Sequence, residues 1–297
     1  MRIAITGSSG LIGTALSRRL NDDGHEVIPV TRSAPKADEI GWSIEEKRIE
    51  DGAFDGLDAV IHLAGAGIAD KRWTDEYKAE ILTSRTVGTA LVAQAINEAK
   101  QPPSVLLSGS AIGYYGSSPT ATFTETDPSG DGFLAETCVA WESSAAPAQD
   151  GGTRVAFLRT GIVLSADGGA LAKQLPLFKF GLGGKMGSGE QWQSWISIDD
   201  EVGAIVHLLD SDVSGPVNLT APNPVTNAQF TETLGDVLHR PTFLPIPKFG
   251  PKLLLGGELA DNLLFTGQKV LPTVLEADGY EFRHTDLRAA LDDLVGS

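Results

Sequence analysis

Three glycines close to the N-terminus have a spacing suited to binding a phosphate group. Gly7, Gly10 and Gly13 follow the apolar run 3–5 and precede the amphipathic segment 14–20. This order predicts a buried strand, a tight turn and a helix. Glycine lets the backbone bend sharply and approach a pyrophosphate closely, and the N–H groups and dipole at a helix start favour an anion. The turn is therefore predicted to bind the pyrophosphate of a dinucleotide, with an ordinary glycine turn as the alternative.

A basic residue after the next predicted strand bears on the identity of the dinucleotide. The run 26–30 predicts a strand, and Thr31 and Arg32 stand at its carboxyl end. In a doubly wound sheet this position contacts the adenosine ribose. A carboxylate there would hydrogen-bond the free 2′-hydroxyl of NAD, whereas a hydroxyl and an arginine suit a 2′-phosphate. NADP(H) is therefore the predicted cofactor, and a solvated arginine is the alternative interpretation.

Several hydroxyl groups follow another predicted strand. The apolar segment 104–108 ends in Ser108, and Ser110, Tyr114 and Tyr115 come shortly after it. Side chains just past the carboxyl end of a parallel strand lie where ligands bind in such sheets. These residues are candidates for contacts with cofactor or substrate. For the two tyrosines the alternative is that they only pack against or line a cleft.

The elements that must position these residues alternate along the first 160 residues. Strands are predicted at 3–5, 26–30, 57–65, 104–108 and 154–159, and helices at 14–20, 73–99 and 133–146. Such alternation predicts an α/β fold with a doubly wound parallel sheet and right-handed crossovers, the NAD(P)-binding Rossmann arrangement.

The strand at 57–65 and the helix after it offer further contacts. The strand ends in Ala64 and Gly65, whose small size leaves room for a ligand. His62 lies inside its apolar run and is predicted to be a packed core histidine. In the following helix Glu80 and Arg85 could reach toward the cofactor, although a surface role competes for both.

The second half of the chain predicts a smaller lobe. Residues 165–195 are rich in glycine and predict a lid or substrate loop, or else an ordinary irregular connection. A helix at 198–209 and a strand at 217–219 return to the sheet, and later helices are predicted at 228–238, 251–264 and 286–294. We therefore predict a Rossmann domain formed by 1–165 plus 196–220, and a C-terminal α+β substrate lobe formed by 166–195 plus 221–297.

Composition narrows the classes of partner. The 297 residues carry a net charge of −16, which disfavours nucleic acid and anionic membranes as partners. Cys138 is the single cysteine, so an intrachain disulfide and a cysteine-rich zinc site are excluded, and no metal site is expected. No signal peptide and no membrane-spanning run is seen. A cytoplasmic monomer or homodimer with a small-molecule substrate is expected.

Four segments together resemble a known family. The turn 6–13, the strand 58–65, the run Ser108-Gly109-Ser110 and the run 198–200 are similar to those of extended short-chain dehydrogenases/reductases, which include the sugar-nucleotide epimerases. The segment 269–291 is similar to the C-terminal extension of an atypical epimerase-like subgroup, sometimes called a cell-division inhibitor family. The resemblance implies a substrate cleft between two lobes, NADP binding, and oxidoreductase or isomerase activity on a small polar substrate such as a sugar nucleotide.

The turn, the strand ends and the resemblance together predict a set of cofactor contacts. They are Gly7, Ser9, Gly10, Leu11, Ile12, Gly13, Thr31, Arg32, Leu63, Ala64, Gly65, Glu80, Arg85, Ser108 and Val163.

The expected active site departs from the family's pattern. Extended dehydrogenases use a serine, a tyrosine and a lysine four residues later; Ser110 matches the serine. On the helix after it, alignment on Glu142 places Leu134 and Cys138 at the tyrosine and lysine positions, and no shift of register restores the pair. In these enzymes the tyrosine exchanges a proton with substrate, and the lysine lowers the tyrosine's pKa. Leucine and cysteine can do neither.

Other groups must therefore carry any acid–base chemistry. Together with Ser110, the nearby phenols Tyr114 and Tyr115 are the candidate catalytic residues. Further acid–base candidates are Glu125, Asp127 and Glu136, while Cys138 is expected to be buried packing rather than a nucleophile. Two functions remain open at this point: an NADP-dependent oxidoreductase or epimerase, and a non-catalytic NADP(H)-binding sensor.

Overall fold

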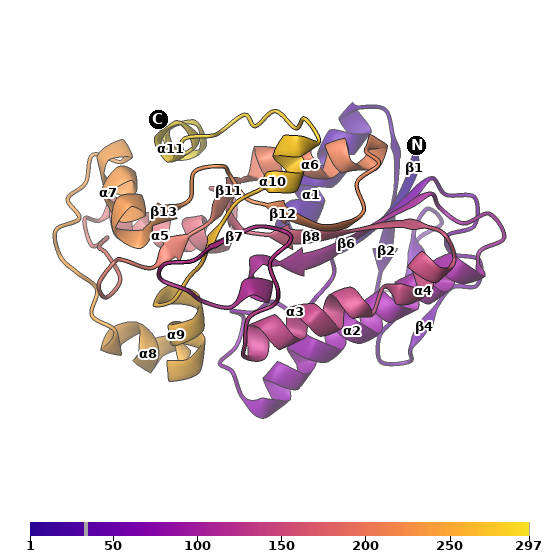
Figure 1. Ribbon diagram of the computed structural model, residues 1–297, viewed down its shortest axis with the longest axis horizontal. Coiled ribbons are helices and arrows are strands. Elements are labelled where there is room, and N and C mark those ends of the chain that lie inside the picture. Colours follow the sequence, from indigo (N-terminus) through magenta and orange to yellow (C-terminus); the bar gives the residue numbers. More distant parts are fainter. Residues whose placement is uncertain (33–34, 297) are drawn as a thin grey trace.

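A mostly parallel sheet forms the centre of the molecule (Figure 1). The computed structural model describes residues 1–32 and 35–296, and within them eight strands join in one sheet. In sheet order they are β12 (Gly215–Leu219), β8 (Arg154–Thr160), β6 (Val105–Ala111), β5 (Ala59–His62), β1 (Arg2–Thr6), β2 (Glu26–Thr31), β3 (Ile40–Ser43) and β4 (Arg48–Ile49). Neighbouring strands are parallel except β3 and β4. The predicted doubly wound parallel sheet is confirmed.

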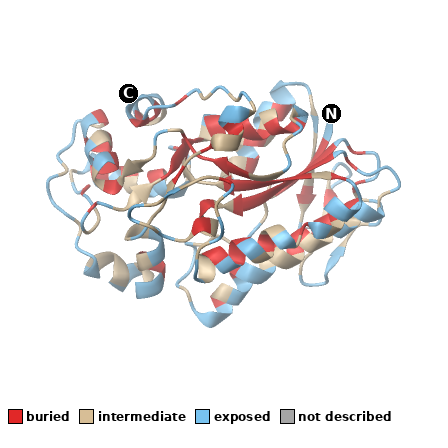
Figure 2. Cartoon of the chain, in the orientation of Figure 1, coloured by how far each residue is buried: buried red, intermediate tan, exposed pale blue. Residues whose placement is uncertain are grey.

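Helices cover both faces of this sheet (Figure 1). One face carries α1 (Leu11–Asp22), α6 (Ile198–Asp210) and α10 (Thr273–Ala277). The other carries α2 (Asp75–Glu98), α3 (Phe133–Ser143) and α4 (Ala146–Asp150). The alternation along β1 shows how one strand serves both layers, because Ile3 and Ile5 pack with α1 and α6 while Ala4 packs on the side of α2. As a result the central strands are buried on both faces (Figure 2).

Strand order reverses between β1 and β5. From β1 the chain continues outward to β2, and from β5 it continues outward in the opposite direction to β6. The carboxyl ends of β1 and β5 therefore flank the crevice in which ligands bind in sheets of this kind. The glycine turn follows β1 directly, so it lies at that crevice.

A second, smaller core lies beyond the sheet at the left of Figure 1. It joins α5 (Gly169–Lys179), α7 (Asn227–Val237) and α11 (Leu287–Val295) around the fully buried Trp195. Near it are α8 (Phe249–Leu255), α9 (Gly257–Leu264), the 3₁₀ turn η1 (Ile112–Tyr115) and the short strands β7 (Thr122–Phe123), β9 (Ile162–Leu164), β10 (Trp192–Gln193), β11 (Trp195–Ser197), β13 (Val225–Thr226) and β14 (Lys269–Val270). This core draws on both segments of the predicted lobe, whereas Leu275 of α10 packs into the core of the sheet. The proposed domain boundaries stay a prediction.

No helix within the described ranges is both long and apolar enough to cross a membrane.

The secondary structure differs from the prediction in four places. The segment 165–195, predicted to be a lid, a substrate loop or an irregular connection, contains helix α5, with Leu171, Leu175 and Phe178 buried on one side. Strands β3 and β4 lie between β2 and β5, where no element is predicted; Ile40 and Trp42 alternate with half-buried residues there, a period-two pattern that the prediction missed. The segment predicted as one helix at 251–264 is two helices, because Gly256 adopts a φ of +96° between them. Strand β6 continues to Ala111, so Ser110 lies within the strand and not beyond its end.

Candidate functional site

The glycine turn is packed so tightly that side chains are excluded from it. Gly7 has a φ of +71°, and a Cβ placed on it would lie 3.0 Å from the amide nitrogen of Ala64. A Cβ on Gly13 would lie only 2.2 Å from the carbonyl oxygen of Gly7. Helix α1 begins immediately after Gly10, and no side chain caps it. The first N–H groups of α1 are therefore available to an anion, as the sequence predicts.

Thr6, which the sequence analysis did not single out, holds the two strand ends together. Its Oγ1 accepts hydrogen bonds from the amides of Leu63, at 3.1 Å, and Ala64, at 3.2 Å, and it lies 2.7 Å from Nδ1 of His62. Because both oxygen lone pairs are used, the hydroxyl donates to Nδ1, and the imidazole carries its proton on Nε2. Burial lowers the pKa of His62 to about 4, so the ring is neutral. His62 is a buried core residue, as predicted.

The residues proposed to contact the adenosine ribose stand at the edge of the sheet. Thr31 ends β2 and pairs with Gly41 of β3. Arg32 follows it, and its side chain is exposed. Within residues 1–32 and 35–296, no carboxylate pairs with the Arg32 guanidinium. The charge of Arg32 is thus free to meet a phosphate.

Most of the remaining predicted cofactor contacts offer surface at the same edge. Ser9, Gly10 and Gly65 are exposed, and the half-buried residues of the set are Leu11, Ile12, Leu63, Ala64 and Val163. Ser108 differs, because it is fully buried in β6 beside His62 and exposes no surface to a ligand. A direct contact between Ser108 and a cofactor is not supported by this position.

The two candidates on α2 occupy different environments. Glu80 lies on the exposed face and pairs with Lys71 at 3.0 Å. Arg85 is buried; its Nη1 donates to the carbonyls of Ala66 and Ile81, and its guanidinium lies 4.9 Å from the ring centre of Trp141. Burial lowers the pKa of Arg85. A Cβ on Gly65 would lie 3.3 Å from the Arg85 guanidinium carbon. The Arg85 side chain therefore packs against the backbone that follows β5.

Ser110 belongs to a buried ionic network that the sequence analysis did not foresee. Its Oγ donates to Oε1 of Glu142 at 2.6 Å. Glu142 accepts two more hydrogen bonds from Arg159, from Nε at 2.8 Å and from Nη2 at 2.9 Å. Arg159 is the penultimate residue of the core strand β8, and its side chain is only 3% exposed. A buried arginine at the carboxyl end of a core strand is the signal that could have identified it.

Glu142 reaches this position through the periodicity of α3. Leu134, Cys138 and Glu142 recur every four residues, so they lie along one face of the helix. A Cβ on Gly113 would lie 3.4 Å from Leu134 and 3.9 Å from Cys138 Sγ, so this face packs on the turn after β6. Burial raises the pKa of Cys138 to about 12. Cys138 is a neutral packing residue, as expected.

The two tyrosines of η1 have different surroundings. Tyr115 is buried; its hydroxyl accepts from Nη1 of Arg159 at 2.9 Å and donates to Oδ1 of Asn218 at 2.7 Å. Burial raises the pKa of Tyr115 to about 12. Tyr114 is half-buried, and its ring centre lies 3.4 Å from the Arg159 guanidinium. In the part of the chain that the structure describes, the Tyr114 hydroxyl has no hydrogen-bond partner.

The network extends from Tyr115 into the C-terminal segment. Asn218 donates through Nδ2 to the carbonyl of Leu271 and through its amide to Glu125. The buried Glu125 also accepts hydrogen bonds from the Thr273 hydroxyl and the Val274 amide. Glu125 therefore anchors the start of α10 to the sheet, and its oxygens are occupied.

The surroundings of Asp127 and Glu136, the other acidic candidates, also do not suit acid–base catalysis. Asp127 accepts from the amide of Thr124 at 2.7 Å and from its hydroxyl at 3.0 Å, which closes a local turn. Glu136 is exposed on α3. Among the phenols and acids predicted, Tyr114 has the free and partly accessible hydroxyl.

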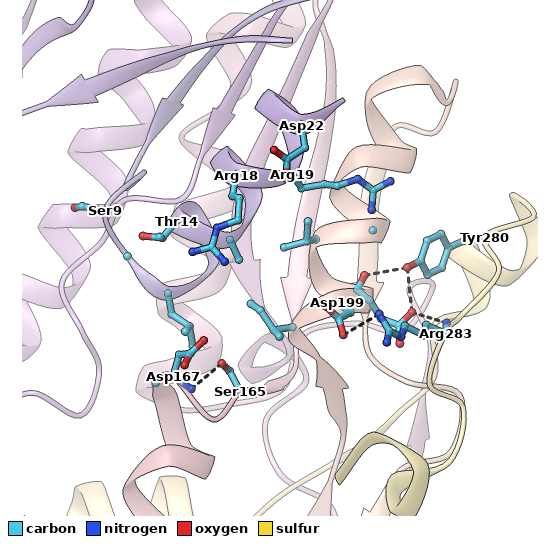
Figure 3. A pocket seen from close by; sticks show the side chains of 18 of the residues that line it. Ser9, Thr14, Arg18, Arg19, Asp22, Ser165, Asp167, Asp199, Tyr280 and Arg283 are labelled. Carbon is cyan, nitrogen blue, oxygen red and sulfur yellow. Dashed lines mark hydrogen bonds and ion pairs between the residues drawn. The ribbon is translucent and has the colours of Figure 1, made fainter. Parts of the chain in front are cut away.

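A groove of about 940 Å³ opens beside the glycine turn (Figure 3). It follows one flank of α1 from Ser9 to Asp22 and is closed on the far side by α6 and the C-terminal segment at Tyr280–Arg283. Three arginines line it, Arg18, Arg19 and Arg283. The lining includes the predicted cofactor contacts Ser9, Gly10 and Leu11, whereas Arg32, Tyr114 and the β5 end are absent from it. The groove therefore meets the predicted nucleotide site only at the glycine turn.

One cluster of possible metal ligands borders this groove. Atoms of Asp199, His284 and Asp293 lie within 4.8 Å of one another. Arg283 pairs with both carboxylates, at 3.5 and 2.9 Å. The cluster is explained by ion pairing.

Comparisons with known proteins agree with this arrangement. Residues 3–220 match the model of the NAD dependent epimerase/dehydratase family, and residues 246–294 match a domain of unknown function, DUF1731. The epimerase family protein Mb2239 of Mycobacterium bovis is 42% identical over 97% of this chain and 96% of its own. The human epimerase family protein SDR39U1, crystallised with NADPH, superposes with a TM-score of 0.91 at 38% identity over 99% of both chains.

A more distant structure shares the fold. The UDP-glucose 4-epimerase of Thermotoga maritima, crystallised with UDP-glucose, superposes with a TM-score of 0.76 over 98% of both chains, at 19% identity. That likeness concerns the fold alone.

Proposed function

Because the chain belongs to the NAD dependent epimerase/dehydratase family, we propose that it is an NADP(H)-dependent oxidoreductase or epimerase acting on a small polar substrate. The observation that supports the cofactor assignment is the combination of two features. The turn has no room for side chains at Gly7 and Gly13, and Arg32, at the end of the neighbouring strand, has no carboxylate partner among the described residues. The NADPH-bound structure of a relative with 38% identity supports the same assignment.

The chain's residues fit such a nucleotide in three places. The N–H groups at the start of α1 would hold the pyrophosphate, since a Cβ on Gly13 would fill the space that the turn needs. Thr31 and Arg32 would hold the 2′-phosphate, where a guanidinium binds phosphate oxygens well. Leu63, Ala64, Gly65 and Val163 would form the floor at the sheet edge. When bound, the nicotinamide supplies hydride transfer.

The acid–base role falls to Tyr114. Its hydroxyl is free and partly accessible, and its ring is held against the Arg159 guanidinium. Tyr115 is unsuited to the role because its hydroxyl is saturated and its pKa is raised to about 12. We therefore assign proton exchange with the substrate oxygen to Tyr114.

Ser110 takes a different part. Because its proton is donated to Glu142, its oxygen is left to accept a hydrogen bond. Ser110 would thus orient a substrate hydroxyl instead of donating to a carbonyl. Because Arg159 holds the Glu142 carboxylate in place, the Ser110 hydroxyl keeps its proton directed toward Glu142.

The cofactor assignment is tested by identifying any nucleotide that purifies with the protein and by titrating NADPH and NADH. Arg32→Glu is expected to weaken NADPH by tenfold or more while changing NADH little, because only NADPH carries the 2′-phosphate. Lys100→Glu makes the same change of charge on an exposed residue before β6, at the opposite end of the sheet, and serves as the control. Equal weakening of both nucleotides by Arg32→Glu contradicts the assignment.

Catalysis is tested with a panel of carbonyl compounds and sugar nucleotides. Turnover linked to NADPH oxidation or NADP⁺ reduction is expected for at least one class, and Tyr114→Phe should abolish it. Failure of the whole panel with folded, NADPH-loaded protein counts against an enzyme.

A non-catalytic sensor is the second candidate, and one observation favours it. Leu134 and Cys138 stand where the family has its tyrosine and lysine, and both are packed against the turn after β6. A sensor must bind NADPH and NADP⁺ with different affinity, because equal affinity cannot shift an equilibrium. Equal affinities, with no partner responding to either form, would exclude this function.

A further inference from the structure

One end of the molecule exposes an unusual number of large apolar side chains. Eight of the twelve exposed large hydrophobic residues in the described chain fall within two short segments, 177–182 and 243–254. They are Leu177, Phe180, Leu182, Phe243, Leu244, Phe249, Leu253 and Leu254. Phe180 is 80% exposed and Phe243 78%, so these side chains project into solvent. A cluster of this kind marks a binding surface.

The stretches of sequence that contain these two segments are cationic in an otherwise acidic protein. Residues 168–189 and 237–257 contain no aspartate or glutamate, although the whole chain carries a net charge of −16. Their basic residues are Lys173, Lys179, Lys185, Arg240, Lys248 and Lys252. Of these only Lys252, which pairs with Asp261, has a carboxylate partner among the described residues. We name these apolar and basic residues together the cationic apolar face.

Backbone and side-chain contacts bring the two segments side by side. Nε of Arg240 donates to the carbonyl of Lys179 at 2.8 Å, and the amide of Ile246 donates to the carbonyl of Lys185 at 2.8 Å. A Cβ on Gly187 would lie 3.1 Å from the Lys248 side chain. The loop between α7 and α8, together with α8, forms the left end of the molecule in Figure 1. The two segments that carry the cationic apolar face therefore lie against each other.

Helix α8 is held so that its leucines remain outward. Nη2 of Arg72 donates to the carbonyls of Leu253 and Leu254, at 2.6 and 3.0 Å, while both side chains are at least 75% exposed. The backbone of this segment is thus tied to the loop before α2, and the side chains are left free for an external partner.

We propose that the cationic apolar face binds the surface of an anionic lipid bilayer. Projecting phenylalanine and leucine side chains with adjacent lysines are the combination that inserts into the headgroup region of anionic membranes. At physiological ionic strength the Debye length is about 8 Å, so the acidic remainder of the protein is screened from a membrane that this end touches. The net charge of the whole protein predicts repulsion from an anionic bilayer. Because the basic residues are gathered at this end, that repulsion is absent where the protein would touch the bilayer.

Two other occupants fit less well. A second copy docked symmetrically on this face would place lysines against lysines, which opposes association. The eight apolar side chains are 46–80% exposed, so they project outward and do not line a groove for a peptide. Both remain outcomes of the test.

The full-length protein is mixed with phosphatidylcholine vesicles with or without 30% phosphatidylglycerol, and the bound fraction is measured by flotation. Binding is expected only to the anionic vesicles at 0.1 M salt and should fall at least tenfold at 0.5 M salt. No binding, or equal binding to both kinds of vesicle, overturns the proposal. Self-association at micromolar concentration that buries this face also overturns it.

Two variants separate the apolar and basic contributions. Phe243→Ser with Leu253→Ser, and Lys179→Glu with Lys185→Glu, are each expected to lower binding to anionic vesicles at least tenfold. Leu82→Ser removes an exposed leucine from α2, away from the face, and should bind as wild type. Because all five side chains are exposed, Tm should be unchanged. If a variant unfolds, the salt dependence of the wild-type protein alone decides the question. Wild-type binding by both folded variants contradicts the proposal.

Discussion

Arg159 and Glu142 are joined by two hydrogen bonds, Nε to Oε1 at 2.8 Å and Nη2 to Oε2 at 2.9 Å, in a nearly dry environment. This pair connects the strand end of β8 to helix α3. It also fixes the direction of the Ser110 hydroxyl and the ring of Tyr114. The Arg159–Glu142 pair at the carboxyl end of the sheet thus orients the candidate catalytic residues Ser110 and Tyr114.

Breaking this pair is expected to be costly. Glu142→Ala leaves the Arg159 guanidinium buried without its carboxylate, which should lower the free energy of unfolding by about 3–5 kcal/mol. The double variant Glu142→Leu with Arg159→Met removes both charges and should lose markedly less. Urea unfolding measures both. A single variant as stable as wild type would show that the ion pair is not buried in solution.

The glycine turn provides a matched pair of substitutions. Gly13→Ala places a Cβ 2.2 Å from the Gly7 carbonyl oxygen, so the turn must open; NADPH binding should be lost and stability should fall by about 1–3 kcal/mol. Gly10→Ala places its Cβ 3.3 Å from the same oxygen and should be tolerated far better. Isothermal titration and thermal unfolding check both variants. Similar losses in the two would contradict the steric explanation.

The two tyrosines should respond in opposite ways. Tyr114→Phe removes an unpaired hydroxyl, so stability should be unchanged while turnover falls at least a hundredfold. Tyr115→Phe leaves Asn218 Oδ1 and Arg159 Nη1 without a partner and should cost about 1–3 kcal/mol of stability while turnover at saturating substrate persists. The measurements are kcat and urea unfolding. The reverse pattern would transfer the acid–base role to Tyr115.

Glu201 should make stability depend on pH. It is fully buried on α6, and burial raises its pKa from 4.5 to about 8. In the unfolded chain this group loses its proton near pH 4.5, whereas in the folded protein it keeps the proton until about pH 8. Its contribution to stability is therefore complete below pH 4.5 and is lost as pH rises through about 8, by about 3 kcal/mol between pH 5 and 8.

Glu201→Gln should remove this dependence. Compared with wild type, the variant should gain stability steadily from pH 5 to pH 8, since glutamine pays no ionisation penalty. Glu136→Gln on the exposed face of α3 is the control and should follow the wild-type curve. Urea unfolding at four pH values gives the comparison. A constant difference between Glu201→Gln and wild type would show that Glu201 titrates normally.

Much of the fold follows from local patterns in the sequence. The strand, glycine turn and helix at 3–20 are specified by hydrophobic periodicity and by the absence of side chains at Gly7 and Gly13. The position of Arg32 also follows from the sequence, because Arg32 is the residue directly after β2. The hairpin β3–β4 was missed because its strands are short, and the break at Gly256 was missed because the leucines on both sides share a helical spacing.

The sequence by itself determined the glycine turn that we propose binds phosphate and the absence of the usual tyrosine–lysine pair, because each depends on residues a few positions apart. The tertiary structure decided which groups surround the position at which we propose acid–base chemistry. Ser110, Glu142 and Arg159 meet from three separate elements, and their hydrogen bonds decide which tyrosine keeps a free hydroxyl. The cationic apolar face likewise exists only because two segments about sixty residues apart lie side by side. Hydrogen-bond partners and surface charge depend on distance in space, and folding alone sets those distances.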